Sequence, residues 1–399
     1  MKFAFRKLKY IHFGDIIDML KILLSFIPGM ILKAVKKDIW LVSERENDAH
    51  DNGYWFYKYV RENYPEKNVY YSISFNCPDY ENRIKPLGNA IKHGSFKHHI
   101  YFWAASKYIS AHIGNGFPAP FMCRLFLMSG FYRFKVVFLQ HGVTSNVPDY
   151  LLNENNKIDL FTVSAEREEK SVIDDLHYAP DKVVRTGMCR FDNLLHCNVM
   201  KNRILIMPTW RHWLYPEYGK KTEDVIEDLR NSNYYKNFKA LFSDQRLLDY
   251  AEKNHLELVY FPHNQMQPFI DEFKKVCPRI ICAKATEYDV QQALKDSAFL
   301  ITDYSSIFFD FAYMKKPLLY FQFDYDEFRE KHYAEGYFDF SKDGFGPVCK
   351  TVDQAVDCLI ESFEKNFDMD EIYQKRVDEF FIFRDGDNCK RNYEAVEAL

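Results

Sequence analysis

Two histidines follow predicted strands, at positions where a side chain can face a ligand. His141 follows the apolar run 136–140 and precedes a glycine that allows a sharp turn; His263 follows the run 257–261 after one proline. In open α/β sheets, ligands bind beyond the carboxyl ends of the strands. Histidine suits proton transfer because its ordinary pKa lies near neutral pH. Both are therefore candidate catalytic residues, and the alternative for each is a structural histidine bonded to the backbone.

A third strand end carries groups that could hold a phosphate. Thr209 and Arg211 follow the apolar run 203–207. The planar guanidinium of arginine makes forked contacts with phosphate oxygens, so Arg211 at a sheet edge is suited to bind one. The alternative is a surface arginine beside a core tryptophan. Thr209 is the adjacent candidate for substrate binding.

A fourth strand end offers a helix terminus. Asp303, Ser305 and Ser306 follow the run 298–302 and lead into a predicted helix. Either serine is a natural N-cap, and the free N–H groups and positive dipole end of a helix form an anion site. Plain capping without a ligand is the alternative. Asp303 is an unfavourable neighbour for a phosphate, so we expect its carboxylate to orient a hydroxyl, a backbone N–H or a histidine.

The chain is poor in glycine, with 15 in 399 residues, so few glycine-built phosphate loops are expected. The segment 114–119 fits G-x-G-x-x-A after a predicted strand. However, Pro118 and Pro120 disfavour a helix directly after it, and no acidic strand end follows about 20 residues on. We therefore reject a dinucleotide site there, and expect phosphates to be held by arginine, histidine and a helix end.

Composition limits the class of protein. Hydrophobic residues make up 47% of the chain and charged residues 28%, which excludes disorder as the main state. The net charge of −4 is less basic than is usual for a nucleic-acid-binding protein. The nine cysteines are scattered without a C-x-x-C motif, so we expect reduced thiols and neither a disulfide framework nor structural zinc. No metal and no cofactor are predicted.

The elements that position these residues alternate between short apolar runs and helical stretches. Such alternation favours parallel sheets covered by helices on both faces. A break near 198–202 divides the chain into two doubly wound domains, predicted at 38–200 and 201–368. Residues 369–399 are predicted as C-terminal helices that could pack back on the first domain. The predicted strands are 39–43, 68–74, 108–112, 136–140, 160–164, 182–186, 203–207, 257–261, 279–282, 298–302 and 317–321, and the helical stretches are 165–176, 222–253, 287–295, 306–315 and 352–366.

Residues 1–37 form a basic, apolar-rich segment in an otherwise acidic protein. Charges and Pro28 interrupt its apolar part, 16–35, which predicts neither a signal peptide nor a membrane-spanning helix. A basic amphipathic helix suits the headgroup region of an anionic leaflet, so we expect membrane association; a helix packed on the core is the alternative. The basic residues are Lys2, Arg6, Lys7, Lys9, Lys21, Lys33, Lys36 and Lys37.

Five motifs, in their order along the chain, resemble the CDP-glycerol glycerophosphotransferase family of teichoic-acid primases, polymerases and related surface-polysaccharide enzymes. The motifs are Leu139-Gln140-His141-Gly142, Thr186 to Asp192, Pro208-Thr209-Trp210-Arg211, Pro262-His263, and Thr302 to Pro317. The resemblance covers roughly residues 39–337. It implies a GT-B-like α/β fold, with two Rossmann-like domains facing across a cleft that holds the active site. It also implies peripheral attachment to the cytoplasmic face of the bacterial cell membrane.

The resemblance further implies a reaction and residue roles. The family transfers glycerol phosphate from CDP-glycerol to a hydroxyl of a lipid-linked teichoic-acid or polysaccharide acceptor, releasing CMP. His141 matches the family's catalytic histidine, which acts as general base on the acceptor hydroxyl. The positions that match phosphate-binding or charge-stabilising groups are Arg190, Arg211, His263, Ser305 and Ser306.

Three alternatives stay open. The donor could be CDP-ribitol. A GT-B glycosyltransferase would share the fold but transfer a sugar from a nucleotide sugar. A catalytically dead membrane-bound binding module would be expected to lose His141 or His263, and both are present. Gln140, Cys189 and the pair Ser145-Asn146 depart from residues common in the family, which leaves the acceptor open.

Overall fold

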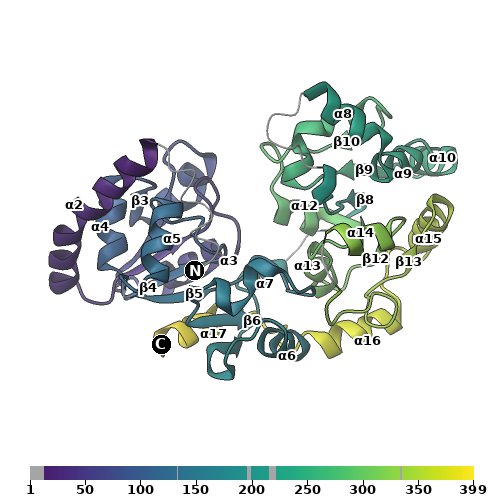
Figure 1. Ribbon diagram of the computed structural model, residues 1–399. Helices are drawn as coiled ribbons and strands as arrows, with labels where there is room; N and C mark the ends of the chain where they lie inside the picture. The colour runs from purple at the N-terminus through teal and green to yellow at the C-terminus, as the bar shows by residue number, and fades with distance from the viewer. Residues whose placement is uncertain (1–12, 133, 196–198, 215–221, 333–334) are drawn as a thin grey trace. The chain divides into compact units, whose positions relative to one another are not determined.

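The structure, a computed structural model, describes residues 13–132, 134–195, 199–214, 222–332 and 335–399 (Figure 1). The chain divides into two compact units. Unit 1 contains the described residues up to Val143, with Pro148–Asn193 and Phe383–Leu399. Unit 2 contains Thr144–Val147 and Leu194–Ile382.

Unit 1 is built on a parallel sheet. Its strands are β1 (Trp40–Ser43), β2 (Val69–Ile73), β3 (Ala90–Lys92), β4 (Lys107–Ser110), β5 (Lys135–Phe138), β6 (Leu160–Val163) and β7 (Val183–Arg185). They lie in the order β3-β2-β1-β4-β5-β6-β7. All residues of β1, β2, β4 and β6 are buried, as expected for strands covered on both faces.

The helices of unit 1 are α2 (Phe13–Val35), α3 (Asn52–Asn63), α4 (Phe96–Ala104), α5 (Pro120–Met128), α6 (Glu166–Asp174), α7 (Phe191–Leu194) and α17 (Asn388–Glu397). In Figure 1, α2 lies alongside α4, and the C-terminal α17 returns to this unit. Helix α3 begins after Asp51, whose side chain accepts the N–H of Asn52. Because α3 follows β1, its first turn lies at the carboxyl edge of the sheet.

Unit 2 repeats the same design. Its strands are β8 (Met200–Ile206), β9 (Glu257–Tyr260), β10 (Ile280–Cys282), β11 (Ser297–Thr302), β12 (Leu318–Phe321) and β13 (Val348–Cys349). They are parallel, in the order β10-β9-β8-β11-β12-β13. The helices are α8 (Thr222–Asn231), α9 (Asn233–Phe242), α10 (Gln245–Lys253), α11 (Ile270–Lys274), α12 (Val290–Asp296), α13 (Ile307–Tyr313), α14 (Tyr325–Lys331), α15 (Val352–Glu364) and α16 (Glu371–Phe380).

Both strand orders place the first strand in the middle of the sheet and reverse direction beside it. The reversal lies between β1 and β4 in unit 1 and between β8 and β11 in unit 2. In open α/β sheets the ligand crevice forms at such a switch point, beyond the carboxyl ends of the strands. The predicted α/β class with two doubly wound parallel sheets is confirmed, and the topology marks one ligand-binding edge in each unit.

Much of the aromatic content lies in unit 2, packed around α13. Phe308 and Phe309 of this helix contact the rings of Phe338 and Phe345 at centroid distances of 5.2–6.1 Å, mostly tilted or edge-to-face. Such arrangements are favoured by the quadrupole of the rings. The helix that follows Asp303, Ser305 and Ser306, within the last of the five motifs, is therefore anchored by aromatic packing.

Several predicted elements differ from the structure. The edge strands β3 and β13 are additional to the predicted set. The predicted helical stretch 222–253 is three helices, because Ser232 and Asp244 each cap a new N-terminus. The C-terminal stretch is two helices, and α16 belongs to unit 2. The expectation that prolines prevent a helix after the glycine motif is wrong, since α5 begins at Pro120, a position where proline needs no N–H partner.

Candidate functional site

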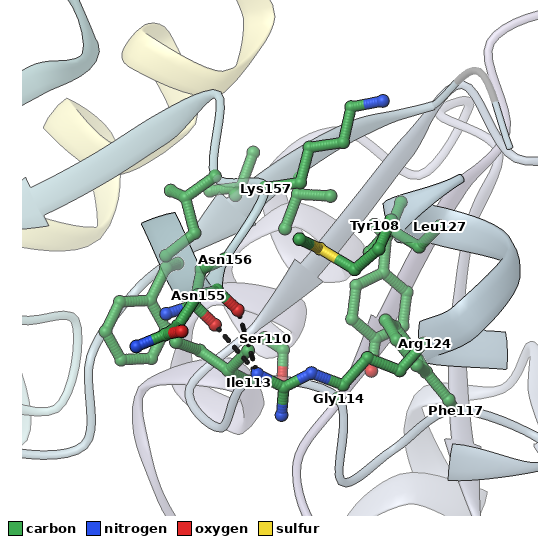
Figure 2. Close-up of a pocket in the computed structure, with 15 residues that line it drawn as sticks. Tyr108, Ser110, Ile113, Gly114, Phe117, Arg124, Leu127, Asn155, Asn156 and Lys157 are labelled. Atoms are coloured by element: carbon green, nitrogen blue, oxygen red, sulfur yellow. Dashed lines mark hydrogen bonds between the residues drawn. The ribbon is translucent and has the colours of Figure 1, made fainter. Parts of the chain in front are cut away.

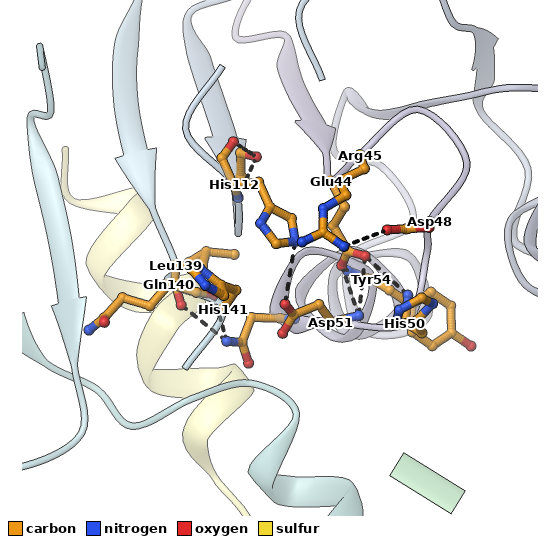
Figure 3. Close-up of polar contacts among 12 residues, drawn as sticks. Glu44, Arg45, Asp48, His50, Asp51, Tyr54, His112, Leu139, Gln140 and His141 are labelled. Carbon is orange, nitrogen blue, oxygen red and sulfur yellow. Dashed lines mark hydrogen bonds and ion pairs between the residues drawn. The ribbon is translucent and has the colours of Figure 1, made fainter. Parts of the chain in front are cut away.

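His141 lies just beyond the end of β5 in unit 1 (Figure 3). The preceding residue, Gln140, has a left-handed φ of +58°, a strained conformation for a residue with a side chain. The side-chain amide of Asn52 donates to the carbonyls of Leu139 and Gln140 at 3.2 and 2.8 Å. The His141 side chain itself is exposed. A strained turn tied to the start of α3 thus presents an accessible imidazole.

Arg190 supports this turn from the protein interior. Only 5% of the residue is exposed. Its Nη1 donates to the carbonyl of His141 at 2.7 Å and to Asp51 Oδ1 at 2.6 Å, and its backbone N–H donates to Asn52 Oδ1 at 2.9 Å. The structure therefore brings Arg190 and His141 together. In the structure, Arg190 holds the backbone of His141 in position. Its predicted contact with a phosphate stays a prediction.

Asp51 and His112 complete this group, although the sequence patterns did not single them out. They follow β1 and β4, the two strands at the switch point of unit 1. His112 Nε2 lies 3.6 Å from Asp51 Oδ2, and the rings of His112 and His141 are 5.0 Å apart with an interplanar angle of 30°. His112 ends the predicted strand 108–112, so the strand-end criterion that selected His141 could have selected it too.

A second carboxylate, Glu44, lies deeper in the same edge. It is fully buried and accepts backbone N–H groups of His50, Asp51 and Tyr54 at 2.7–3.2 Å. Burial and the charge of Asp51 raise the pKa of Glu44 to about 7. Burial alone would lower the pKa of His50, but its hydrogen bond to Asp79 and the nearby carboxylates raise it to about 9. Glu44 thus fixes the backbone that leads into α3.

The protonation states around His141 follow from these neighbours. Burial raises the pKa of Asp51, but Arg190, His112 and His141 outweigh this effect and leave it below its ordinary value. The surrounding protein lowers the pKa of His141, Asp51 raises it, and Arg190 lowers it; the net direction is down. Burial also lowers the pKa of His112. At neutral pH the group holds an ionised carboxylate beside an imidazole, His141, that can accept a proton.

In unit 2, Arg211 lies in the interior at the end of β8. Its side chain is 0% exposed, and its Nε and Nη2 donate to the carboxylate of Asp324 at 2.7 and 3.0 Å. Its Nη1 contacts Asp303 Oδ2 at 2.8 Å and donates to the Thr209 carbonyl at 2.7 Å. Burial disfavours the charged guanidinium, but these two carboxylates raise the pKa of Arg211 above its ordinary value. A phosphate contact by Arg211 stays a prediction, because these partners cover its side chain completely.

Asp303 orients backbone N–H groups, one of the roles expected for it. Its Oδ1 accepts from the backbone of Thr209 at 2.8 Å and of Tyr304 at 2.6 Å. It thereby joins the ends of β8 and β11, the strands at the switch point of unit 2. The buried hydroxyl of Thr209 makes no hydrogen bond within the described residues. Thr209 and Asp303 thus lie side by side, and a ligand role for the Thr209 hydroxyl stays a prediction.

Ser305 and Ser306 precede α13, which begins at Ile307. Both are partly exposed. Ser306 stands at the N-cap position of α13, as predicted, but it has a helical conformation and its hydroxyl makes no capping bond. A ligand role for these serines stays a prediction.

His263 follows β9 and belongs to a cluster of rings around Trp210. Its Nδ1 accepts the N–H of Gln265 at 3.2 Å, so a neutral His263 carries its proton on Nε2 and can donate it. Its ring stacks on Trp210 at 6.0 Å and 16°. His332, which no motif indicated, lies edge-to-face with Trp210 at 5.2 Å. Burial, with the charge of Arg211 and two neighbouring histidines, lowers the pKa of His332 to about 3.

Outside the two strand-end groups, the described residues form a small cavity in unit 1 and no metal site. A cavity of about 20 Å³ lies in unit 1 near Tyr108, Arg124 and Asn156 (Figure 2); this is room for about one water. In Figure 2 the Arg124 guanidinium points to the Asn155 carbonyl, to which it donates at 3.0 Å. Within the described ranges, no group of three or more His, Cys, Asp or Glu residues could hold a metal ion. The two strand-end groups therefore remain the candidates.

Comparisons with known proteins agree on one family. The family model described as CDP-glycerol:poly(glycerophosphate) glycerophosphotransferase matches residues 28–398. The minor teichoic acid biosynthesis protein GgaB of Bacillus subtilis (strain 168) is 33% identical over 368 residues, covering 91% of this chain and 40% of that protein. A teichoic acid glycerol-phosphate transferase of Staphylococcus aureus is 25% identical over 272 residues, covering 63% of this chain and 64% of that protein.

Solved structures show the same fold at low identity. The wall teichoic acid polymerase TagF superposes with a TM-score of 0.65 at 17% identity, covering 100% of this chain and 98% of that one; a variant of it was soaked with CDPG. A putative UDP-N-acetylglucosamine 2-epimerase from Listeria monocytogenes superposes at 0.56 with 14% identity, covering 90% and 96%. The chain spans 40% and 59% of the length of two curated relatives, GgaB and a teichoic acid poly(glycerol phosphate) polymerase of Bacillus spizizenii.

Proposed function

The chain belongs to the CDP-glycerol:poly(glycerophosphate) glycerophosphotransferase family, and on this basis we propose that it transfers glycerol phosphate from CDP-glycerol to a hydroxyl of a teichoic-acid or surface-polysaccharide acceptor linked to lipid. CMP is the second product. The observation that carries the proposal is the match of the family model over residues 28–398, which includes both strand-end groups. CDPG soaked into a variant of TagF supports the choice of donor.

His141 acts as the general base in this reaction. Its imidazole accepts the proton of the acceptor hydroxyl, whose oxygen attacks the β-phosphorus of CDP-glycerol. The bond from that phosphorus to the bridging oxygen breaks, and the electron pair leaves with CMP. The exposed side chain and lowered pKa of His141 support this role, because the imidazole is free of its proton at neutral pH.

The groups of unit 2 bind the donor. His263 donates from Nε2 to a phosphate oxygen as negative charge develops there, and this donor role rests on the bond that occupies its Nδ1. The Thr209 hydroxyl and the serines 305 and 306 supply neutral donors. Arg211 and Asp303 hold these groups in place through the buried contacts between the ends of β8 and β11. Arg190 holds the His141 turn.

The test is a donor panel with the purified chain and native membranes as acceptor. We expect CMP release from CDP-glycerol that depends on the membranes and that stops in His141→Ala. CMP release from CDP-ribitol instead would support the ribitol alternative. UDP release from a UDP-sugar would indicate a glycosyltransferase, and no turnover with any donor would contradict the proposal.

We also propose that α2 attaches the protein to the cytoplasmic face of the membrane. One side of α2 packs on α4, where Ile22 is fully buried and its carbonyl accepts the indole N–H of Trp103 at 2.9 Å. The remaining surface exposes a band of large apolar side chains: Ile16, Ile17, Leu20, Leu23, Leu24, Phe26, Ile27, Met30, Ile31 and Val35. Such a band beside lysines suits an interfacial helix. The basic residues Lys2, Arg6, Lys7 and Lys9 lie outside the described residues.

Vesicle sedimentation tests this attachment. None of the helices in the described ranges is both long and apolar enough to cross a bilayer. We expect the wild type to sediment with vesicles containing phosphatidylglycerol and the double variant Leu24→Asp, Ile27→Asp to stay in the supernatant. Ile372→Asp, which adds a charge at an exposed apolar position of α16, should sediment like the wild type. Equal sedimentation of all three would contradict the proposal.

A further inference from the structure

Asp51 is an ionised carboxylate enclosed by cationic and imidazole groups. Its side chain is 14% exposed. One oxygen pairs with Arg190 at 2.6 Å, and the other lies 3.6 Å from His112 Nε2. In Figure 3, Asp51 lies between the His141 turn and Glu44, below His112. Burying a charge costs free energy, so the ionised Asp51 requires strong compensation from these neighbours. A surface ion pair would not require it.

The same contacts connect Asp51 to the His141 turn in two ways. The Nη1 atom of Arg190 that binds Asp51 also donates to the His141 carbonyl at 2.7 Å. The Asn52 side chain, next in the chain, holds the carbonyl of Gln140 at 2.8 Å. The negative charge of Asp51 also acts on the imidazole, where it opposes the effect of Arg190. Position and charge of His141 therefore both depend on the start of α3.

We propose that Asp51 is a positioning residue for His141, which fixes the turn through Arg190 and supplies the counter-charge for the imidazolium that forms during the reaction. This rests on the proposed function. When the acceptor hydroxyl gives its proton to His141, a positive charge appears close to the permanent charge of Arg190. Asp51 offsets that repulsion, and the proton later leaves to water.

Other charged groups face this site and must be kept constant in a test. Arg45, which lowers the pKa of His141, pairs with Asp48 at 3.3 Å. His50 pairs with Asp79 at 3.0 Å. Glu44 contacts Asp51 through the Asp51 backbone N–H. Because it is a carboxylic acid, it adds no positive charge near His141. The neutral His112, whose pKa burial lowers, adds no charge at neutral pH. Asp51 is thus the carboxylate in direct contact with Arg190.

Asp51→Asn is the informative substitution because it removes the charge and keeps the shape. Asparagine is as good an N-cap as aspartate, so the start of α3 is preserved. Asp51→Glu restores the charge with altered reach. Asp79→Asn is the matched control, since it removes a carboxylate from the same edge that contacts His50 and the backbone of Ala49 and not Arg190.

The first readout is the pKa of the His141 imidazole in the intact chain, measured by NMR of ¹³C-labelled histidine and assigned with His141→Gln. We expect Asp51→Asn to lower this pKa by about 0.5–1 unit, Asp51→Glu to restore most of it, and Asp79→Asn to leave it unchanged. The second readout is kcat for CMP release and its pH profile. We expect kcat to fall about tenfold or more in Asp51→Asn, with the acid limb shifted to lower pH and KM for the donor little changed.

The outcomes separate this inference from the proposed function. A folded Asp51→Asn variant with the wild-type His141 pKa would overturn the role of Asp51, whatever the activity. A loss of kcat without any pKa shift would reduce Asp51 to a structural residue and also overturn it. If the wild type releases no CMP from CDP-glycerol, the proposed reaction fails, while the NMR measurement still decides whether Asp51 controls His141.

Discussion

At the residue scale, the candidate base His141 combines three properties. Its backbone follows a strained Gln140, its carbonyl is held by a buried arginine, and its imidazole is exposed with a lowered pKa. Strain of this kind persists only where the surroundings determine the conformation, and it concentrates at functional sites. The rigid backbone fixes the imidazole without covering it, which is what a general base for a bulky acceptor requires.

The first prediction concerns this histidine. His141→Ala should lower kcat for CMP release about 10²–10⁴-fold, the usual contribution of a general base. The melting temperature should stay close to the wild type, because an exposed side chain contributes little packing. His177→Ala, at an exposed position of the same unit, is the control. A His141→Ala protein that melts normally and transfers at the wild-type rate would contradict the assignment.

The second prediction concerns Arg211. Removing the Asp324 side chain leaves a buried guanidinium with less compensation, so Asp324→Ala should cost about 3–5 kcal/mol in the free energy of unfolding of unit 2. Urea titration followed by tryptophan fluorescence measures this. Asp326→Ala, at an exposed position of α14, should stay within about 0.5 kcal/mol. Near-wild-type stability of Asp324→Ala would show that Arg211 does not need this carboxylate.

The two arginines also show what a sequence can predict at this scale. Their place after strands was predictable, because strand ends follow from the apolar runs. Their burial was not, because the partners of Arg211 and Arg190 come from distant segments, Asp324 lying 113 residues and Asp51 lying 139 residues away in the chain. Asp51 was missed for the same reason, because it lies beside His141 only when β1, β4 and β5 are neighbours in the sheet. His112, at the end of a predicted strand, could have been selected, but its contact with Asp51 could not be predicted.

At the element scale, the helix ends decide how the site is held. Asp51 caps α3, Asp303 joins the ends of β8 and β11, and Ser306 precedes α13 without making a capping bond. The predicted strands correspond to apolar runs, which are readable in a sequence even where only one residue in three is buried, as in β7 and β10. The edge strand β3 (AIK) has one large apolar residue and β13 (VC) has two residues in all, too few to form such a run.

The third prediction concerns the docking of α17 on unit 1. The carboxylate of Asp192 accepts the backbone N–H groups of Asn388 and Cys389 at 3.0 and 2.8 Å, and so acts as a cap supplied by a distant segment. Asp192→Ala should destabilise unit 1 by about 1–2 kcal/mol, lower the melting temperature and expose the C-terminus to proteases. Asp181→Ala, at an exposed position, is the control, and protection of the C-terminus equal to that of wild type would contradict the docking role.

At the scale of the whole molecule, both units use the same strand order and place their candidate groups at the same edge of the sheet. This repetition explains why strand-end reasoning found residues in both. It also means that each unit must bury polar residues close to that edge. Several of these buried polar residues are histidines. His98, His99 and His112 are buried in unit 1, and His332 is mostly covered in unit 2.

The fourth prediction follows from these histidines. Burial lowers the pKa of His99 to about 4 and of His332 to about 3, and lowers that of His98 well below its ordinary value. In the unfolded chain they take up protons below pH about 6.5. The contribution of these histidines to the free energy of unfolding is therefore fully present above that pH. It is lost as the pH falls toward 4, by roughly 1–2 kcal/mol for each such histidine at pH 5.

Thermal melts between pH 7.5 and 4.5 measure this loss. His99→Leu removes one titrating group from the packed interface of α4 and should flatten the decline, so that the variant gains stability relative to wild type as the pH falls. His177→Leu, at an exposed position, should follow the wild-type curve. Parallel curves for His99→Leu and wild type would show that His99 is not held neutral by burial, because the unfolded chain would then gain no proton that the folded protein lacks.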